Sequence, residues 1–184
     1  MGRGSRRVEF VCQDPMATVR AANVRATLEA FTLVPSVGRR IAAKHQLAVD
    51  HLTPDRVVPV QRWLDALKEI QSTVGTEVVR KVGRQIILNA HFPPQFPTVE
   101  SILQSLDAIY YLNHTGEVGH YECTVQGGAL VIRCATPYPR YFEWGLIEGI
   151  CGSRVAAGRR YFVSFEEGPP GGDVTCTITV RAAK

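Results

Sequence analysis

Apolar residues recur at three- and four-residue spacing through the first half of the chain and at two-residue spacing near its end. The first pattern is typical of amphipathic helices, and the second is typical of strands with one buried face. The clearest helical segment follows Pro59, which stands where a first-turn proline belongs. Thr98 is predicted to cap the last helix of this half. The predicted helices are residues 23–31, 36–45, 60–72, 76–89 and 98–113.

The second half predicts two strand pairs with a helix between them. Residues 119–125 and 129–135 are joined by a short turn with two glycines, which is a hairpin signal. A helix is predicted over 141–151, and strands follow over 159–166 and 174–180. The predicted fold class is α+β, with a helical N-terminal half followed by a four-stranded, mostly antiparallel sheet in helix-β-β-helix-β-β order.

The helix at 141–151 carries two glycines one turn apart, Gly145 and Gly149. Each costs about 1 kcal/mol against alanine in a helix interior, so a close approach of another group should compensate for them. Phe142, Leu146 and Ile150 repeat beside them and indicate a mostly buried helix. Tight packing in the core is the favoured interpretation, and the floor of a ligand site or a partner surface is the alternative.

The length of 184 residues and a hydrophobic content of 45% indicate one globular domain with a substantial core. We expect a flexible tail over 1–20 and a single domain over 21–184, divided into a helical part, 21–97, and a sheet-containing part, 98–184. No apolar run reaches the roughly 20 residues that span a bilayer, and no apolar signal core follows the basic start. We therefore expect a cytoplasmic protein without a membrane span.

The remaining composition argues against several function classes. A formal charge of +4 with scattered arginines does not favour nucleic acid as a partner. Five cysteines without a CxxC pair predict reduced thiols and no metal site. Glu143 and Glu148 are five residues apart and lie on different faces of one helix, so they are not an acid–base pair, and Glu148 is expected to bond Arg133 or Arg140. No catalytic motif is present, and we expect neither an enzyme nor a cofactor.

Residues 106–110, the hairpin after them, the helix segment 144–150 and the last strand pair resemble the C-terminal part of heme nitric-oxide/oxygen-binding domains. They resemble equally the 4-vinyl-reductase-type small-molecule-binding domain and the related transport-protein-particle fold. The whole chain is also similar in plan to myxobacterial proteins of about this size. The resemblance implies the α+β fold and a small-molecule site.

The same resemblance argues against ordinary heme. Heme-binding members have a proximal histidine where this chain has Tyr110, and a Tyr-x-Ser-x-Arg propionate clamp where this chain has 130–136. Tyrosine does ligate heme iron in catalases, so Tyr110 as an atypical ligand, with His114 one turn beyond it, is the least favoured interpretation. The favoured interpretation is a tyrosine packed in the core with its hydroxyl bonded, and His114 as a surface residue.

From these observations we expect a non-catalytic bacterial sensor or regulatory module that binds a small apolar ligand. The first alternative is a ligand-free module for protein–protein interaction or homodimerisation, and the second is an atypical heme or metal protein. The predicted ligand-binding residues are Tyr110, Trp144, Gly145, Leu146, Ile147, Gly149 and Cys151.

Overall fold

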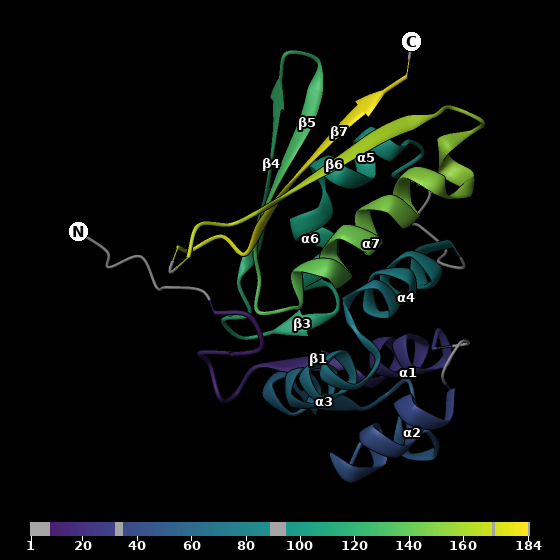
Figure 1. Ribbon diagram of the computed structural model, residues 1–184, viewed down its shortest axis with the longest axis vertical. Helices are drawn as coiled ribbons and strands as arrows, with labels where there is room; N and C mark the ends of the chain where they lie inside the picture. The colour runs from purple at the N-terminus through teal and green to yellow at the C-terminus, as the bar shows by residue number, and fades with distance from the viewer. Residues whose placement is uncertain (1–7, 32–34, 89–94, 171, 184) are drawn as a thin grey trace.

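The computed structural model describes residues 8–31, 35–88, 95–170 and 172–183, and it confirms the expected α+β class and the helix-β-β-helix-β-β order (Figure 1). The helical half occupies one end of the molecule and the large sheet occupies the other. Its helices follow the predicted segments to within a few residues. They are α1 (Ala21–Glu29), α2 (Pro35–Lys44), α3 (Val60–Val74) and α4 (Thr76–Leu88), with the 3-10 turn η1 (Val49–His51) between α2 and α3.

The large sheet has the strand order β4-β5-β7-β6, and every neighbouring pair is antiparallel. Alternation along the last strand follows the sequence pattern, because Cys176, Ile178 and Val180 are buried while Thr177 and Thr179 are only partly buried. The sheet therefore presents one apolar face to the core. Its strands are β4 (His120–Gln126), β5 (Ala129–Ala135), β6 (Tyr161–Glu167) and β7 (Cys176–Ala182).

A second, three-stranded sheet was not predicted. It has the order β2-β1-β3, formed by β1 (Thr18–Arg20), β2 (Val57–Pro59) and β3 (His114–Thr115). Strands of two or three residues are too short to show a period in the sequence. Residues 8–20 were expected to belong to a flexible tail, but β1 within this segment pairs with two other strands. Residues 1–7 lie outside the described part of the chain.

The helix predicted over 98–113 is divided into α5 (Val99–Gln104) and α6 (Leu106–Tyr111) at Ser105. Thr98 caps it as expected, since its hydroxyl accepts a hydrogen bond of 3.1 Å from the backbone N–H of Ser101. The cap satisfies one of the unpaired donors in the first turn.

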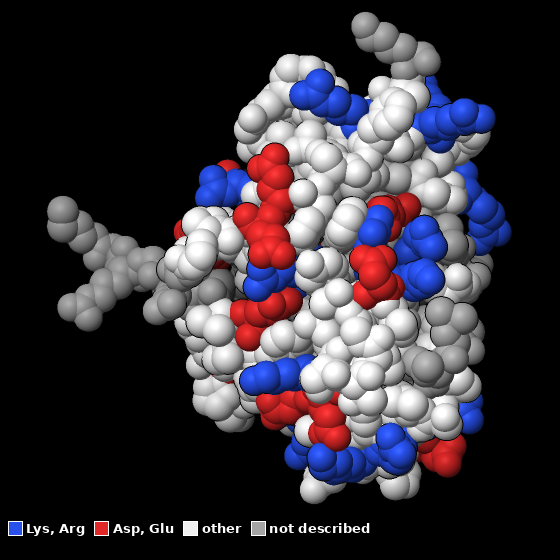
Figure 2. All heavy atoms as spheres, in the orientation of Figure 1, with Lys and Arg blue, Asp and Glu red and all other residues white. Residues whose placement is uncertain are grey.

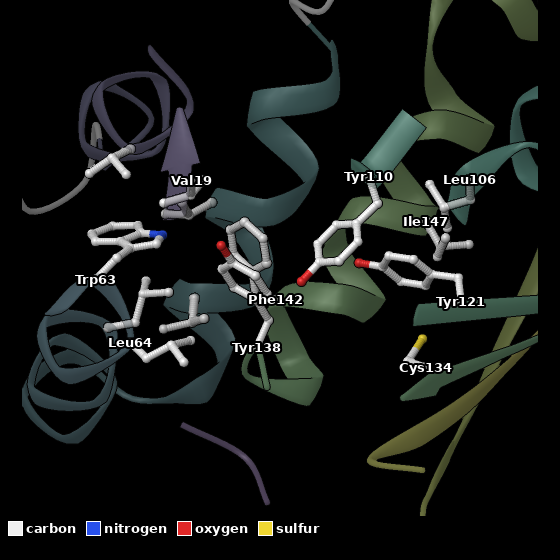
Figure 3. Close-up of a cluster of buried hydrophobic side chains, with 14 of the residues drawn as sticks. Val19, Trp63, Leu64, Leu106, Tyr110, Tyr121, Cys134, Tyr138, Phe142 and Ile147 are labelled. Carbon is white, nitrogen blue, oxygen red and sulfur yellow. The ribbon is translucent and has the colours of Figure 1, made fainter. Parts of the chain in front are cut away.

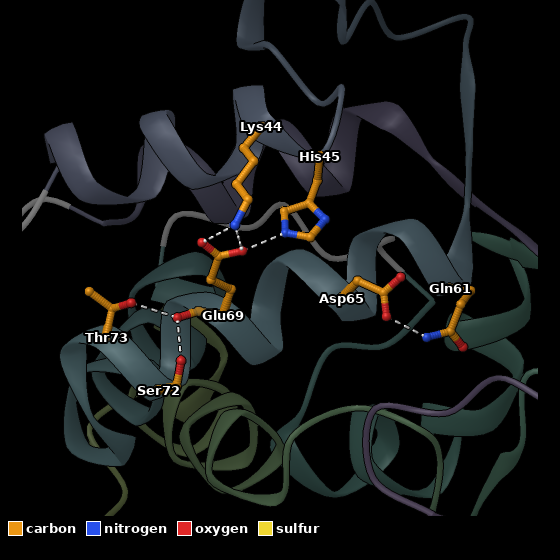
Figure 4. Close-up of polar contacts among 7 residues, drawn as sticks. All are labelled: Lys44, His45, Gln61, Asp65, Glu69, Ser72 and Thr73. Carbon is orange, nitrogen blue, oxygen red and sulfur yellow. Dashed lines mark hydrogen bonds and ion pairs between the residues drawn. The ribbon is translucent and has the colours of Figure 1, made fainter.

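Polar contacts at the surface join the helical elements. Glu69 on α3 binds both Lys44 and His45 at the end of α2, with nitrogen–oxygen distances of 2.9 Å (Figure 4). Acidic and basic side chains alternate on the face shown in Figure 2, and neither sign forms a continuous patch there. Within the described residues, none of the helices combines the length and hydrophobicity that crossing a membrane requires.

The glycine-bearing helix α7 (Arg140–Gly152) crosses α4 at very short range. A Cβ atom at Gly145 would overlap the backbone oxygen of Arg80, and one at Gly149 would lie 2.6 Å from the backbone oxygen of Arg84. Gly83 on α4 faces the backbone of α7 in the same way. The glycines therefore serve helix–helix packing, which is the interpretation favoured from the sequence.

The partner of Glu148 differs from the one expected. Glu148 binds Arg80 on α4, with 3.0 Å from Nε of Arg80 to the carboxylate. Arg133 instead lies 3.7 Å from Glu122, and Arg140 pairs with Glu9 and Glu167. The correction follows from the close crossing, which brings α4 nearer to Glu148 than the sheet is. The 3-10 turn η2 (Arg154–Ala156) follows α7 and leads to β6.

Replacing Gly145 by alanine should lower the free energy of unfolding by about 1–3 kcal/mol, because the added methyl group meets backbone and not a flexible side chain. The matched control is Gly38→Ala on α2, where a Cβ would lie 3.4 Å from the ring of Phe31. The control should be neutral or stabilising by up to about 1 kcal/mol. Urea denaturation measures both, and equal stabilities would contradict the tight crossing.

A cavity as candidate functional site

A cavity of about 590 Å³ lies where α1, α4, α6, α7 and β1 meet. Its size falls within the range of roughly 300–1,000 Å³ that is typical of small-molecule sites. The lining is mostly apolar, with a few polar side chains. It consists of Val19, Arg20, Asn23, Thr27, Trp63, Ile86, Ile87, Ile102, Leu106, Ile109, Tyr110, Leu112, Asn113, His114, Tyr121, Tyr138, Phe142, Leu146 and Ile150.

One wall is a stripe along α7 formed by Phe142, Leu146 and Ile150. These residues are four apart and therefore share a face of the helix. Successive helical residues are about 100° apart, so Leu146 points to a different side than Gly145, which faces α4. Ile86 and Ile87, near the end of α4, contribute a neighbouring wall. The close crossing of the two helices thus places both apolar walls around one space.

The polar lining is gathered at one place, because two chain segments are joined there by backbone hydrogen bonds. The backbone N–H of Arg20 donates to the carbonyl of Asn113 at 2.9 Å, and Val19 pairs with His114 in the small sheet. Asn23 follows in the first turn of α1. Arg20, Asn23, Asn113 and His114 therefore form a polar end of the cavity.

His114 is held in a single tautomer by its two partners. Its Nδ1 lies 2.9 Å from the backbone carbonyl of Tyr110, which can only accept, so Nδ1 carries the proton. Its Nε2 lies 2.8 Å from the hydroxyl of Tyr138, which then donates to it. Burial lowers the pKa of His114 from 6.5 to about 4, so the ring is neutral near pH 7.

A cluster of aromatic rings surrounds Tyr110 (Figure 3). Its ring makes edge contacts with Tyr121 and Tyr138, with centroids 5.2 and 6.2 Å apart, and lies 4.0 Å from the ring of His114. The Tyr110 hydroxyl donates to the carbonyl of Val118 at 3.0 Å, and burial raises its pKa well above the usual value. Tyr110 is therefore a core tyrosine with a bonded hydroxyl that also lines the cavity.

A buried carboxyl lies behind this wall. Glu143 on α7 is only 1% exposed, and it accepts hydrogen bonds from the hydroxyls of Tyr121, at 2.6 Å, and Thr136. Burial raises its pKa from 4.5 to about 7, although the two hydroxyl donors act in the opposite direction. The sequence placed Glu143 on a helix but gave no sign of its burial, because the hydroxyls come from β4 and from the segment after β5.

Two of the seven predicted ligand-binding residues, Tyr110 and Leu146, line the cavity. The other five lie elsewhere, and a ligand role for them stays a prediction. Gly145 and Gly149 contact α4, and Ile147 is fully buried in the core. Cys151 is buried outside the lining, where burial raises its pKa to about 12. Trp144 stacks on Phe165 at 4.7 Å, with the Arg80 guanidinium carbon 3.3 Å from its ring centre.

The polar end of the cavity was missed by sequence reasoning. Arg20 fell in the expected tail, and the lone residues Asn23 and Asn113 carry no motif. For His114 the favoured interpretation from the sequence was a surface residue, with a role as a heme ligand as the alternative. Pairing of the two very short strands β1 and β3 brings these positions together, and no local sequence pattern predicts this pairing. In the described residues, no cluster of three or more His, Cys, Asp or Glu side chains could hold a metal ion.

The chain has the fold of H-NOX domains. An oxygen-binding H-NOX domain related to soluble guanylate cyclases matches with a TM-score of 0.62 at 18% identity, over 90% of this chain and 95% of that one. A mutant of the T. Tengcongensis H-NOX matches with a TM-score of 0.63 at 17% identity, over 90% and 98%. The S. oneidensis H-NOX protein in its Fe(II)NO state matches with a TM-score of 0.63 at 13% identity, over 89% and 98%.

No family model and no curated protein matches the chain. At identities below 20%, the three structures establish the architecture and not the chemistry of the site. The resemblance noted in the sequence is thereby confirmed at the level of fold. What the cavity binds has to be argued from its own side chains.

The residues of the cavity do not fit a heme in this arrangement. A heme iron needs a donor with a free lone pair, but the Tyr138 hydroxyl caps Nε2 of His114. The raised pKa of Tyr110 disfavours the phenolate that would bind iron. Two propionates call for two cationic or strong hydrogen-bonding partners, and Arg20 is the one charged side chain in the described lining.

Addition of hemin to the purified protein should therefore give no Soret band of a histidine- or tyrosine-ligated heme that survives gel filtration. The reason is that both candidate donors are already engaged. Absorption spectroscopy at a 1:1 ratio measures this. A band that survives washing and disappears in His114→Ala would show that Tyr138 yields to iron, and it would overturn the assignment.

Glu143 should make stability depend on pH. Because its pKa is about 7 in the folded protein against 4.5 unfolded, its stabilising effect is complete below 4.5 and is lost as the pH rises through 7. His114, with a lowered pKa, acts in the opposite sense between about 4 and 6.5. Glu143 by itself should therefore lower the free energy of unfolding progressively between about pH 4.5 and 7, and comparison with a variant that lacks this carboxyl separates its effect from that of His114.

The matched variant is Glu143→Gln, which keeps the shape and removes the titration. Between about pH 4.5 and 7 the native protein should lose stability relative to this variant, as measured by urea denaturation of both proteins at several pH values. An identical pH dependence in both proteins would contradict the role of Glu143.

Proposed function

We propose that this protein is a cytoplasmic, non-catalytic sensor or regulatory module that binds a small, mostly apolar ligand in the cavity. The observation that carries the proposal is the cavity itself, about 590 Å³ with a mostly apolar lining and a cluster of polar groups at one end. Such an arrangement buries the body of a ligand and orients it through a few hydrogen bonds.

The polar groups around the cavity favour binding over catalysis. Both ring nitrogens of His114 are hydrogen-bonded within the protein, and the Tyr110 hydroxyl donates to a backbone carbonyl. A general base needs a free lone pair directed at its substrate. These groups are instead used to hold the wall of the cavity in one arrangement.

The neighbouring structures agree with a sensing role, since the names of those proteins state that they bind oxygen or nitric oxide. The cytoplasmic setting is supported by Cys12, Cys123, Cys134, Cys151 and Cys176, which all carry reduced thiols. A protein partner or a homodimer as the output of the sensor stays a prediction, and light scattering of the ligand-free and ligand-bound protein tests it.

Native mass spectrometry of protein purified from its own host should show a bound small molecule, and a library of apolar compounds should raise the melting temperature. Binding to the folded state alone stabilises it according to the concentration of free ligand relative to Kd. Absence of any copurified molecule, together with no shift by any compound, would contradict the proposal.

Filling the cavity should abolish these shifts without unfolding the protein. Leu146→Phe adds volume on the α7 stripe and should weaken ligand binding at least about tenfold. The control is Val125→Phe on β4, which adds a ring at a position 64% exposed and outside the lining. Equal ligand-induced shifts in both variants would place the binding site elsewhere.

A further inference from the structure

We propose that the ligand is an amphipathic monocarboxylate, with its headgroup on Arg20 at the polar end and its hydrocarbon body along the Phe142–Leu146–Ile150 stripe. This inference rests on the proposed function and names the class of its ligand. Three observations support it. The described lining carries one positive charge, and the guanidinium of Arg20 is held so that its terminal nitrogens can meet a ligand. The lining also changes from polar to apolar along α7.

The charge of the described lining is that of a single cation. Arg20 is a cation, as arginine side chains are in proteins. His114 is neutral because both its nitrogens are bonded in a buried setting, and no Asp or Glu belongs to the described lining. Glu143 reaches the wall only from behind, through the hydroxyl of Tyr121. One uncompensated cation favours one anionic group on the ligand.

Arg20 is positioned to receive that group. Its backbone N–H is bound to Asn113, and its Nε donates to the carbonyl of Leu112 at 3.0 Å. The first bond fixes the backbone of Arg20 and the second holds its guanidinium, while its two terminal nitrogens bond no side chain or carbonyl among the described residues. A guanidinium held in this way presents a fork of donors that matches the two oxygens of a carboxylate. Arg20 is exposed, so the headgroup would lie at the rim.

The cavity changes from polar to apolar along α7. Phe142 lies nearest the polar end, since its ring stacks on Tyr138 at 6.0 Å and Tyr138 is bonded to His114. Leu146 and Ile150 follow one and two turns later, so the stripe extends about 12 Å at 1.5 Å per residue. Ile86, Ile87 and Ile102 face the same space. A flexible or planar apolar body attached to one polar head fits this gradient.

Isothermal titration at pH 7.4 with decanoate, methyl decanoate and decanol tests the proposal on the native protein. The acid should bind about three- to tenfold more tightly than the ester or the alcohol, because only the acid pairs with the guanidinium. Equal binding of the three would overturn the carboxylate assignment and leave the proposed function intact. Failure of all three, and of aromatic carboxylates with their methyl esters, would count against both.

Arg20→Gln should remove the preference for the acid while binding of the ester is unchanged. The matched control is Arg25→Gln on α1, whose guanidinium pairs with Glu29 on the surface and does not line the cavity. A preference that persists in Arg20→Gln, or is lost equally in Arg25→Gln, would contradict the role of Arg20. If Arg20→Gln does not fold, the comparison of acid and ester on the native protein decides alone.

Ile150→Phe tests the direction of the ligand. It should abolish binding of dodecanoate but retain octanoate, because it shortens the apolar end and leaves Arg20 untouched. An equal loss of both acids would contradict the proposed orientation.

Discussion

The contact between α4 and α7 is the constraint on which the site depends. Gly83, Gly145 and Gly149 allow the two helix backbones to touch, with no side chain between them. Contact at this range fixes the rotation of α7, because any other face would bring a Cβ atom into α4. Because the glycine face of α7 packs against α4, Leu146 and the residues that share its face line the space beside the crossing. The walls of the cavity are thus a consequence of helix packing.

Buried polar groups make the rest of the wall rigid. His114, Tyr138 and Tyr110 are bonded to one another or to backbone, and Glu143 takes two hydroxyl donors. Leaving one of these buried groups without its partner would cost about 1–3 kcal/mol, so the bonds resist rearrangement. The same bonds occupy the donors that a heme or a reaction would need. The wall therefore suits binding of a molecule whose own polar head meets the rim.

The chain shares the architecture of H-NOX domains, and the chemistry of its cavity is set by its own side chains. A shared fold keeps the packing of helices on a sheet, whereas a handful of side chains decides what the enclosed space accepts. In this chain the hydroxyl of Tyr138 is bonded to Nε2 of His114, and Arg20 lies at the polar end of the cavity. These are features of single side chains, and they leave the helices and strands in place.

The sequence by itself determined the main helices, the strands of the large sheet and their order, because helical and strand periods and the caps at Thr98 and Pro59 are local properties. It also indicated that Gly145 and Gly149 needed a close neighbour, but not which one. Only the tertiary structure decided that α4 is this neighbour, that Glu148 pairs with Arg80, and that β1 brings Arg20 beside His114. Those contacts join residues more than 60 positions apart, and such pairings follow from packing of the whole chain and not from any local pattern.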